Sequence, residues 1–325
     1  MEYFMMDDEE KETFLENLVK ESTSSHILDI PPMRISRLPA LPHKLKELSV
    51  RGIYFKEGIL PSLPTTLQIL DCYECNLIQL PELPKTLTYL DCSKNKLCYL
   101  PTLPSKLVIL YCEQTLIQCF PEIPESLTLL DCSNNSGLRF LPKELHNVQE
   151  IRCDNCILTK LPQLPSTLKK LNCTDNRLTE LPELPNGLEL LSCDRNLLTV
   201  LPTIPKSLQF FTCSKNQLST LPRLPYTLRY IAWGGNKWNA KFAQIMLSTS
   251  PIHSINLWYD VLHLKKNIHR TRNIYYAFQG NAFPEDIVEI VHSFQSGSKI
   301  PMAKYVEQLK STIQTKERDF HDNVQ

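Results

Sequence analysis

The chain carries no net charge and little glycine. Lys and Arg together number 35, as do Asp and Glu, and only 8 of the 325 residues are glycine. Zero net charge removes the general attraction to nucleic acid or acidic membranes that a strongly basic chain would have. The scarcity of glycine, combined with 24 prolines, is unusual for a catalytic α/β domain and requires another explanation.

Long apolar runs and a signal sequence are also missing. No segment approaches the roughly 18 consecutive apolar residues that span a bilayer. The opening residues, MEYFMMDDEEKETF, have no basic region and no apolar core, so they do not resemble a secretory signal. We expect a cytoplasmic protein without membrane partners. Its 12 cysteines are then expected to be reduced thiols rather than a disulfide framework.

Self-similarity at a period of 20 residues dominates the middle of the chain. The units share the pattern L-x-x-L-x-C-x-x-N-x-L-x-x-L-P-x-L-P, as in LTYLDCSKNKLCYLPTLPSK from Leu87. This is a leucine-rich-repeat signature with cysteine in its third apolar position. Two units are longer: the one from Leu45 has two extra residues, and another has one near Ser136. Regular units begin at Leu45, Leu67, Leu87, Leu107, Leu127, Val148, Leu168, Leu188, Leu208 and Leu228, and a degenerate one passes through Leu28, Ile30, Met33 and Ile35.

The repeat predicts a solenoid. The L-x-x-L-x-C run predicts a short strand with alternate side chains inward, so that neighbouring units pair into a parallel sheet. The asparagine turns the chain inward, and its amide satisfies backbone groups of the loop. Two prolines per unit favour an extended, polyproline II return path. We therefore expect a leucine-rich-repeat horseshoe with a parallel sheet on its concave face, an extended convex side and helical segments at both ends.

Most cysteines fall in one column of this repeat, which predicts that they are core residues, because a buried free cysteine behaves as a small hydrophobe. Cys75 and Cys156 take the asparagine position, so their C-x-x-C spacing follows from the repeat. The alternative, zinc or redox use, requires converging ligands, and we expect no metal and no cofactor. Cys98 and Cys119 lie outside both columns and are expected to be exposed. The column comprises Cys72, Cys92, Cys112, Cys132, Cys153, Cys173, Cys193 and Cys213.

The 20-residue unit and its L-P-x-L-P return resemble the bacterial leucine-rich-repeat effectors of the YopM and IpaH group over about residues 25–238. The resemblance implies a solenoid that grips host proteins, capped by N-terminal helices. One departure is cysteine where that group has valine, alanine or leucine, which leaves a viral or other origin open. The IpaH branch also has a ubiquitin-ligase domain with a catalytic cysteine. Because no cysteine follows Cys213, we do not expect that activity.

The two ends have helical patterns. Residues 7–22 have apolar residues at helical spacing after a run of acids, which predicts an N-terminal helix. We divide the chain into a helical cap with the degenerate repeat (1–33), the solenoid (34–240) and a C-terminal helical region (241–325). In the last region, FPEDIVEIVHSF resembles the start of an F-box, with Pro284 and Ile287 as adaptor-docking residues. An ordinary helix start explains the same residues. A basic and aromatic stretch at residues 265–276 fits a solvated helix face better than a nucleic-acid patch.

The outward strand positions supply the candidate binding face. Acids and interleaved tyrosines dominate its N-terminal half, a combination suited to a basic protein segment. The alternative is an ordinary solvent-exposed sheet surface. The candidate partner-binding residues are Asp71, Tyr73, Glu74, Tyr89, Asp91, Tyr111, Asp131, Arg152, Asp154, Phe210 and Tyr230.

These observations favour a non-enzymatic protein-binding scaffold over an enzyme, because the chain has no G-x-x-x-x-G-K-[ST] and no H-E-x-x-H. We expect protein partners, including host proteins met in the host cytosol if the chain is an effector. We expect no catalytic residue, no small-molecule substrate and no nucleic acid. Two alternatives remain: a substrate-selecting adaptor that recruits a ubiquitin ligase through the F-box-like segment, and a structural component of a larger assembly.

Overall fold

The computed structural model describes residues 6–240, 242–243, 252, 255–256 and 259. The chain divides into two compact units, Met1–Asn239 and Ala240–Gln325. In the second unit the described residues are helical. The rest of the expected C-terminal helical region lies outside the described residues, and so do the stretch 265–276 and the adaptor-docking residues Pro284 and Ile287.

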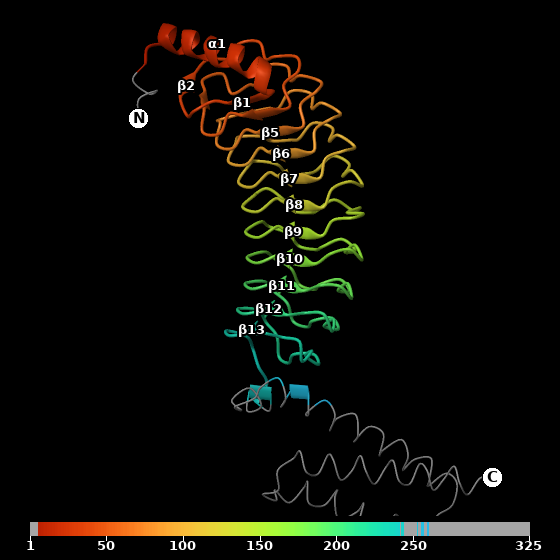
Figure 1. The fold of residues 1–325 in the computed structure, drawn as a ribbon. Helices are drawn as coiled ribbons and strands as arrows, with labels where there is room; N and C mark the ends of the chain where they lie inside the picture. Colours follow the sequence, from red (N-terminus) through yellow and green to blue (C-terminus); the bar gives the residue numbers. More distant parts are fainter. Residues whose placement is uncertain (1–5, 241, 244–251, 253–254, 257–258, 260–325) are drawn as a thin grey trace, which may run out of the picture. The chain divides into compact units, whose positions relative to one another are not determined.

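The first unit is a stack of coils, each of which adds one strand to an 11-stranded parallel sheet (Figure 1). The strands pair in sequential order and in register, so that Leu70 pairs with Leu90 and Leu90 with Leu110. The predicted parallel solenoid is therefore confirmed. The strands are β1 (Ile27–Asp29), β3 (Glu47–Ser49), β5 (Ile69–Asp71), β6 (Tyr89–Asp91), β7 (Ile109–Tyr111), β8 (Leu129–Asp131), β9 (Glu150–Arg152), β10 (Lys170–Asn172), β11 (Leu190–Ser192), β12 (Phe210–Thr212) and β13 (Tyr230–Ala232).

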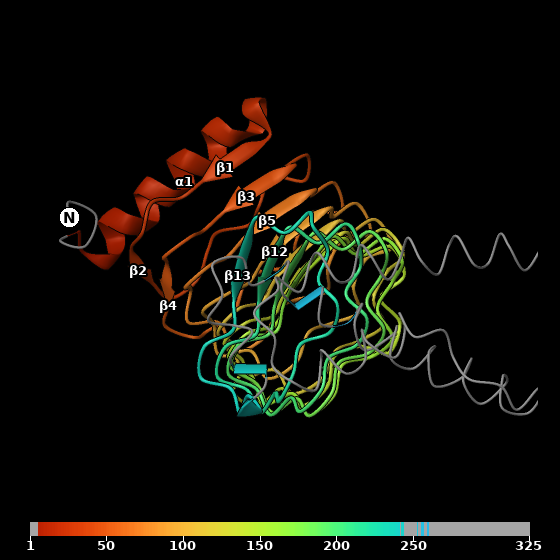
Figure 2. The same ribbon diagram turned by 90° about the horizontal axis from the view of Figure 1, so that it is seen from below.

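Each strand of this sheet before β13 buries its central residue, and its two flanking residues point outward. Leu70, Leu90 and Leu110 are 0% exposed, as expected from the two-residue alternation of a strand. Figure 2 looks along the stack and shows the coils lying over one another, with the strands along one side of each coil. The core therefore runs through the middle of the stack, and the outer side of the sheet remains free for other roles.

The degenerate repeat forms the first coil. Leu28, Ile30, Met33 and Ile35 are all buried, and β1 pairs with β3 in the next coil. A second, two-stranded sheet joins β2 (Arg34–Ile35) to β4 (Tyr54–Phe55). The unit that passes through residues 28–35 thus adds a coil although it lacks the consensus cysteine and asparagine.

The N-terminal helix α1 (Asp8–Ser25) confirms the helix expected near the start of the chain. Asp7 caps it: its side chain accepts hydrogen bonds from the N–H groups of Glu9 and Glu10, and the Glu10 carboxylate accepts one from the Asp7 N–H. This reciprocal arrangement satisfies N–H groups that have no partner within the helix. The helix ends at His26, whose φ of 62° is left-handed.

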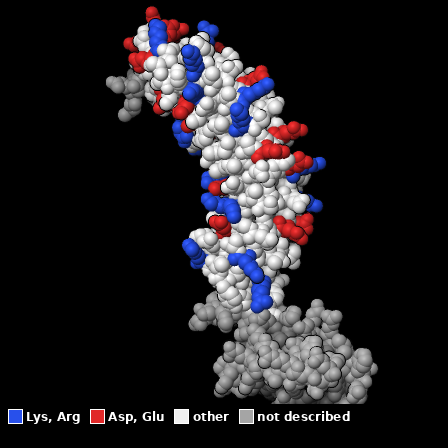
Figure 3. Space-filling model, turned by 45° about the vertical axis from the view of Figure 1, so that its right-hand side comes forward, with Lys and Arg blue, Asp and Glu red and all other residues white. Residues whose placement is uncertain are grey.

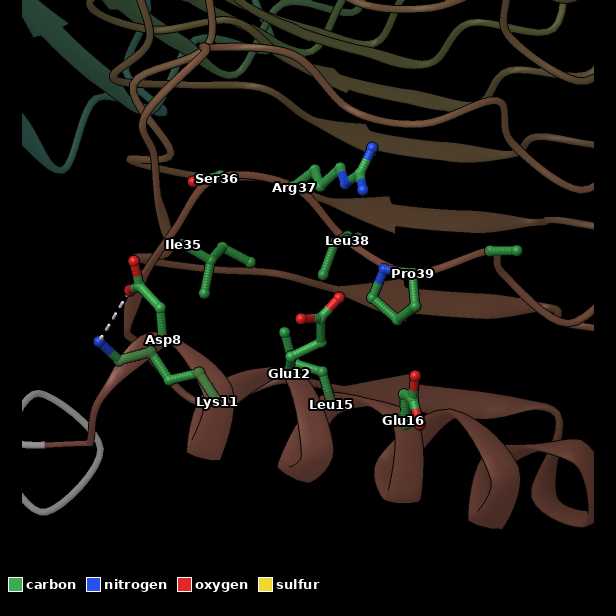
Figure 4. Close-up of a pocket in the computed structure, with 11 residues that line it drawn as sticks. Asp8, Lys11, Glu12, Leu15, Glu16, Ile35, Ser36, Arg37, Leu38 and Pro39 are labelled. Carbon is green, nitrogen blue, oxygen red and sulfur yellow. Dashed lines mark ion pairs between the residues drawn. The ribbon is translucent and has the colours of Figure 1, made fainter.

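The helix α1 is fixed to the first coils by apolar and ionic contacts. Leu15 is 3% exposed, and Lys56 Nζ lies 3.0 Å from Asp8 Oδ2. Between α1 and the segment 35–40 lies a groove of about 470 Å³ (Figure 4). Its walls carry three carboxylates and two basic side chains, which largely compensate one another. These are Asp8, Glu12, Glu16, Lys11 and Arg37.

The cysteine column is buried, as predicted. All eight members are 0% exposed, and burial raises the pKa of each thiol, to about 12 for Cys173. Seven of the thiols also contact a carbonyl in the next coil: Cys112 Sγ lies 3.3 Å from the Asp131 carbonyl oxygen, which also accepts the Cys112 N–H. Cys98 and Cys119 are exposed, as expected.

The asparagine column pairs the backbone of successive coils. The Asn95 amide donates to the carbonyl oxygens of Cys72, one coil earlier, and Cys92. Its oxygen accepts from the Cys75 and Leu77 N–H groups. The prediction that this amide satisfies buried loop groups is therefore confirmed. Asn95, Asn135, Asn176, Asn196, Asn216 and Asn236 make equivalent bonds.

Cys75 and Cys156 replace asparagine where the preceding coil is longer than 20 residues. There the loop pairs more of its own groups: Ile53 N–H donates to the Val50 carbonyl, and Leu138 N–H to the Asn135 carbonyl. An asparagine oxygen in the following coil is then less needed as an acceptor for the N–H groups of this loop. The thiols keep the remaining contact, since Cys75 Sγ lies 2.9 Å from the Val50 carbonyl oxygen and Cys156 Sγ 3.4 Å from that of Cys132.

Candidate protein-binding face

The candidate binding residues all belong to the outer side of the 11-stranded sheet or to the loop directly after a strand. We call this surface the strand face. Tyr89, Phe210 and Tyr230 hold the first position of their strands. The residues at the third position are Asp71, Asp91, Tyr111, Asp131 and Arg152. Tyr73, Glu74 and Asp154 follow in the loops, Glu74 with a left-handed φ of 58°.

The first acidic pair is held by one arginine. Arg51 Nη1 lies 3.4 Å from Asp71 Oδ2 and 3.7 Å from Asp91 Oδ2. The same guanidinium stacks over the Tyr73 ring, with Cζ 3.8 Å from the ring centroid. Each aspartate also accepts the N–H two residues later, from Tyr73 and from Ser93. These bonds fix the turn after each strand.

A second charged cluster lies on β8, β9 and β10. Arg152 donates to Glu150 Oε1 through Nε at 2.7 Å and approaches Asp131 Oδ2 at 3.5 Å. Lys170 Nζ lies 3.1 Å from Glu150 Oε2. Partial burial raises the pKa of Glu150, but the hydrogen bonds and charges of Arg152 and Lys170 outweigh it, so the net pKa is lowered.

Two of the predicted acids are much less accessible than an open acidic surface requires. Asp91 is 7% and Asp131 5% exposed. Burial raises the pKa of Asp91, and neighbouring Asp71 adds to this, while Ser93 and Arg51 oppose it. Bases from other coils and turn N–H groups engage these carboxylates, which leaves little of them exposed to a partner.

The tyrosines of the strand face form a contact pair. The Tyr89 and Tyr111 rings lie 5.9 Å apart at 56° to one another, a tilted geometry that aromatic pairs favour. Burial, followed by the charges of Asp91 and Asp71, raises the pKa of Tyr89 to about 12. Tyr89 is therefore neutral under physiological conditions and offers a ring and a hydroxyl rather than a charge.

An apolar stripe runs across four consecutive strands, and only one of its residues, Tyr89, is among the binding residues predicted from the sequence. It consists of Ile69, Tyr89, Ile109 and Leu129, the first residues of β5 to β8, each paired in register with the next. All four are half-buried. Its signal in the sequence is an apolar residue directly before the buried leucine of each of these four strands.

Charged residues bound the stripe at both ends. Glu47 pairs with Ile69 on one side, and Glu150 pairs with Leu129 on the other. Beyond Glu150 and Lys170, the first position becomes apolar again at Leu190, Phe210 and Tyr230. Phe210 is 43% and Tyr230 55% exposed. Near them, Thr212 Oγ1 is buried without a hydrogen-bond partner among the described residues.

Within the described residues, no three or more potential ligands converge to hold a metal ion. The described helices include none that is long and apolar enough to cross a bilayer. Figure 3 shows one side of the first unit, a mostly uncharged surface on which small groups of both signs are scattered.

Comparison with known proteins identifies solved structures with a similar fold. No protein-family model and no curated protein matches the chain. Among solved structures, YopM from Yersinia enterocolitica WA-314 is 26% identical with a TM-score of 0.54, over 70% of this chain and 64% of its own. The chain therefore spans slightly less than two thirds of that protein.

Two further structures are similar. YopM from Yersinia pestis, a leucine-rich effector protein, is 26% identical with a TM-score of 0.54 over 69% of this chain and 82% of its own. The leucine-rich-repeat domain of APL1B is 18% identical with a TM-score of 0.50 over 66% of this chain and 68% of its own, which supports the fold alone. The coils of this chain thus form a leucine-rich-repeat solenoid similar to that of the YopM effectors.

Proposed function

We propose that this protein is a non-enzymatic scaffold that binds a partner protein on its strand face. The observation that carries the proposal is the apolar stripe of Ile69, Tyr89, Ile109 and Leu129. The core of these coils is complete without these side chains, since the central leucine of each of the strands β5 to β8 is already 0% exposed. Apolar and aromatic residues on a rigid surface are the usual anchors of protein interfaces.

The arrangement of the coils supports this role. A solenoid presents one long, preformed surface, because each coil contacts only its neighbours and repeats the same geometry. A preformed surface lowers the ordering cost of binding. The similarity to YopM of Yersinia pestis, named a leucine-rich effector protein, supports an effector-like role. We therefore propose a host protein as the partner and the host cytosol as the place of binding.

The test is a pair of matched substitutions in one coil. Ile109→Lys places a charge within the apolar stripe, whereas Leu116→Lys places the same charge on a side chain that is 51% exposed outside the strand face. Both variants and the unchanged chain are used to capture proteins from host-type cytosol. We expect a partner retained by the unchanged chain and by Leu116→Lys but lost with Ile109→Lys.

Two results would contradict the proposal. Equal capture by all three proteins would place binding elsewhere on the chain. Equal loss with both substitutions would point to nonspecific effects of added charge. Thermal unfolding of each variant, followed by circular dichroism, establishes that the coils remain folded.

A further inference from the structure

We infer that the apolar stripe holds a short amphipathic α-helix of the partner, lying along the stack with a basic flank over the acidic loops beside the stripe. This inference rests on the proposed function and specifies the partner's binding segment. Four features of the strand face lead to it: the spacing of the stripe, its paired backbone, its one-sided charge and its limited length.

The spacing of the stripe matches a helix. Neighbouring strands lie about 4.8 Å apart, so the four in-register side chains from Ile69 to Leu129 span roughly 14 Å. One helical turn rises about 5.4 Å, and apolar residues at i, i+4, i+7 and i+11 cover about 16 Å on one helix face. In an extended segment, side chains on one face recur every ~6.8 Å, which places only every second or third one over a strand.

The backbone of the strand face is already paired. β6 and β7 each have a hydrogen-bonded neighbour on both sides, so a partner strand has no free edge to join at the stripe. Strand addition requires such an edge. A helix satisfies its own backbone and needs only side-chain contacts, which is what the stripe offers.

Charge is distributed unequally on the two sides of the stripe. On one side, the third strand positions and the loops after them bring six carboxylates together with the three basic groups of Arg51, Lys94 and Arg152. On the other side, the position directly before the stripe is uncharged in all four coils of the stripe, with Gln68, Thr88, Val108 and Thr128, and the coil before them carries Lys46. The six carboxylates are those of Asp71, Glu74, Asp91, Glu113, Asp131 and Asp154.

Two of these carboxylates, Glu113 and Asp154, form no ion pair within the described residues. The hydrogen-bond partners of Asp154 are Ser133 and Asn172, and that of Glu113 is Asn134, all of them neutral. Both acids are half-buried, so solvent screens them less than it screens a fully exposed pair. A helix with Lys or Arg along one flank would place cations beside them, and a helix with acids there would be repelled.

The charged ends set the length of the helix. Glu47 and Glu150 pair in register with the two end residues of the stripe, Ile69 and Leu129. An apolar helix face that extended beyond either end would lie on a carboxylate. The stripe therefore accommodates about three turns, or roughly 11–14 residues.

The experiment selects ligands from two displayed peptide libraries against the immobilised full chain. In the first library, 16-residue peptides built on a helix-forming background carry apolar residues at i, i+4, i+7 and i+11. In the second, peptides carry alternating apolar residues in an extended, β-branched background. Both are also selected against Ile109→Lys and against the control Leu116→Lys. Flanking positions are randomised over Lys, Glu, Gln and Ala.

We expect the helical library to yield peptides with Lys along one flank. Their affinity should fall at least tenfold with Ile109→Lys and less than twofold with Leu116→Lys. Replacing the flank Lys by Glu in a selected peptide should weaken it at least tenfold at low salt. Enrichment of extended peptides alone, lost with Ile109→Lys, would overturn the inference and leave the proposed function standing. Enrichment of helical peptides without Lys along one flank would overturn the inference that the partner helix has a basic flank. If neither library yields ligands that depend on Ile109, the inference and the proposed function both fail.

Discussion

The Asn176 side-chain amide donates a 2.8 Å hydrogen bond to the backbone carbonyl of Cys153, twenty-three residues earlier. The same amide nitrogen also donates to the carbonyl oxygens of Cys173 and Thr174, and the Asn176 side-chain oxygen accepts from the Leu158 N–H. One buried side chain thus satisfies four backbone groups in two coils.

Asn176→Ala should therefore be strongly destabilising. Leaving a buried polar group without a partner costs about 1–3 kcal/mol, and more than one group is affected here. We expect a loss of about 3 kcal/mol in the free energy of unfolding, measured by urea denaturation. Cys156→Ala is the matched comparison, since its thiol makes weaker bonds to two carbonyls. An equal loss of unfolding free energy in Cys156→Ala would contradict the conclusion that the asparagine amide holds the backbone more strongly than the thiol that replaces it.

Thiol accessibility should divide the cysteines into two classes. Cys98 and Cys119 are exposed, and the other ten are buried. Burial raises the pKa of Cys75 to about 12 and of Cys156 to about 11, which removes the reactive thiolate. We expect an aromatic disulfide reagent to modify two thiols rapidly in the folded protein and all twelve in urea. The double substitution of Cys98 and Cys119 by serine should abolish the rapid phase, and a surviving rapid phase would show that a column thiol is accessible.

Asp91→Asn should preserve or increase stability at neutral pH. Burial raises the Asp91 pKa above its usual 3.8, so ionisation is harder in the folded chain than in the unfolded chain. The associated stability is present below pH 3.8 and is lost as the pH rises through the folded pKa. Asparagine keeps an oxygen for the Ser93 N–H. The melting temperature at pH 7 should be equal to or higher than that of the unchanged chain, with the difference shrinking toward pH 3. A clearly lower melting temperature at pH 7 would mean that the ion pair between Arg51 and Asp91 outweighs the cost of burying the carboxylate.

Glu150→Gln should have the opposite pH dependence. Bonds from Arg152 and Lys170 lower the net pKa of Glu150 from its usual 4.5, so its stabilising effect is present above that value and disappears as the pH falls through the folded pKa. We expect a loss of roughly 0.5–1 kcal/mol at pH 7 and none at strongly acidic pH. The two melting series, recorded side by side, form each other's control. Parallel pH profiles for the two variants would refute both assignments.

Asp7→Ala should loosen the start of α1. The substitution removes the side chain that accepts from the Glu9 and Glu10 N–H groups, and loss of such a cap costs about 1 kcal/mol. Hydrogen exchange should accelerate over the first turn of α1, while the central coils keep their protection. Asp7→Ser retains a capping oxygen and should behave like the unchanged chain. Equal exchange in all three proteins would show that contacts with the first coil, rather than the cap, hold the helix.

The periodic features of this fold could be predicted from sequence because each depends on a residue's place within its own unit. Leu90, Cys92 and Asn95 are examples: their burial follows from the repeat. Contacts that depend on side-chain reach between units could not be predicted. Asp91 was read as a surface acid, yet Arg51, two coils earlier, closes over it. The replacement of asparagine by Cys75 and Cys156 was visible in the sequence, but its link to the longer preceding units required the loop hydrogen bonds.

Seven of the eight thiols in the cysteine column donate a hydrogen bond in the same direction, from one coil to the next, as from Cys92 to Tyr111 and from Cys173 to Ser192. Each of these units therefore takes part in the same kind of bond along the cysteine column. Duplication or deletion of one such unit within the gene would join matching donors and acceptors along this column. The number of coils, and with it the length of surface on display, is thus open to change by recombination without redesign of the interior.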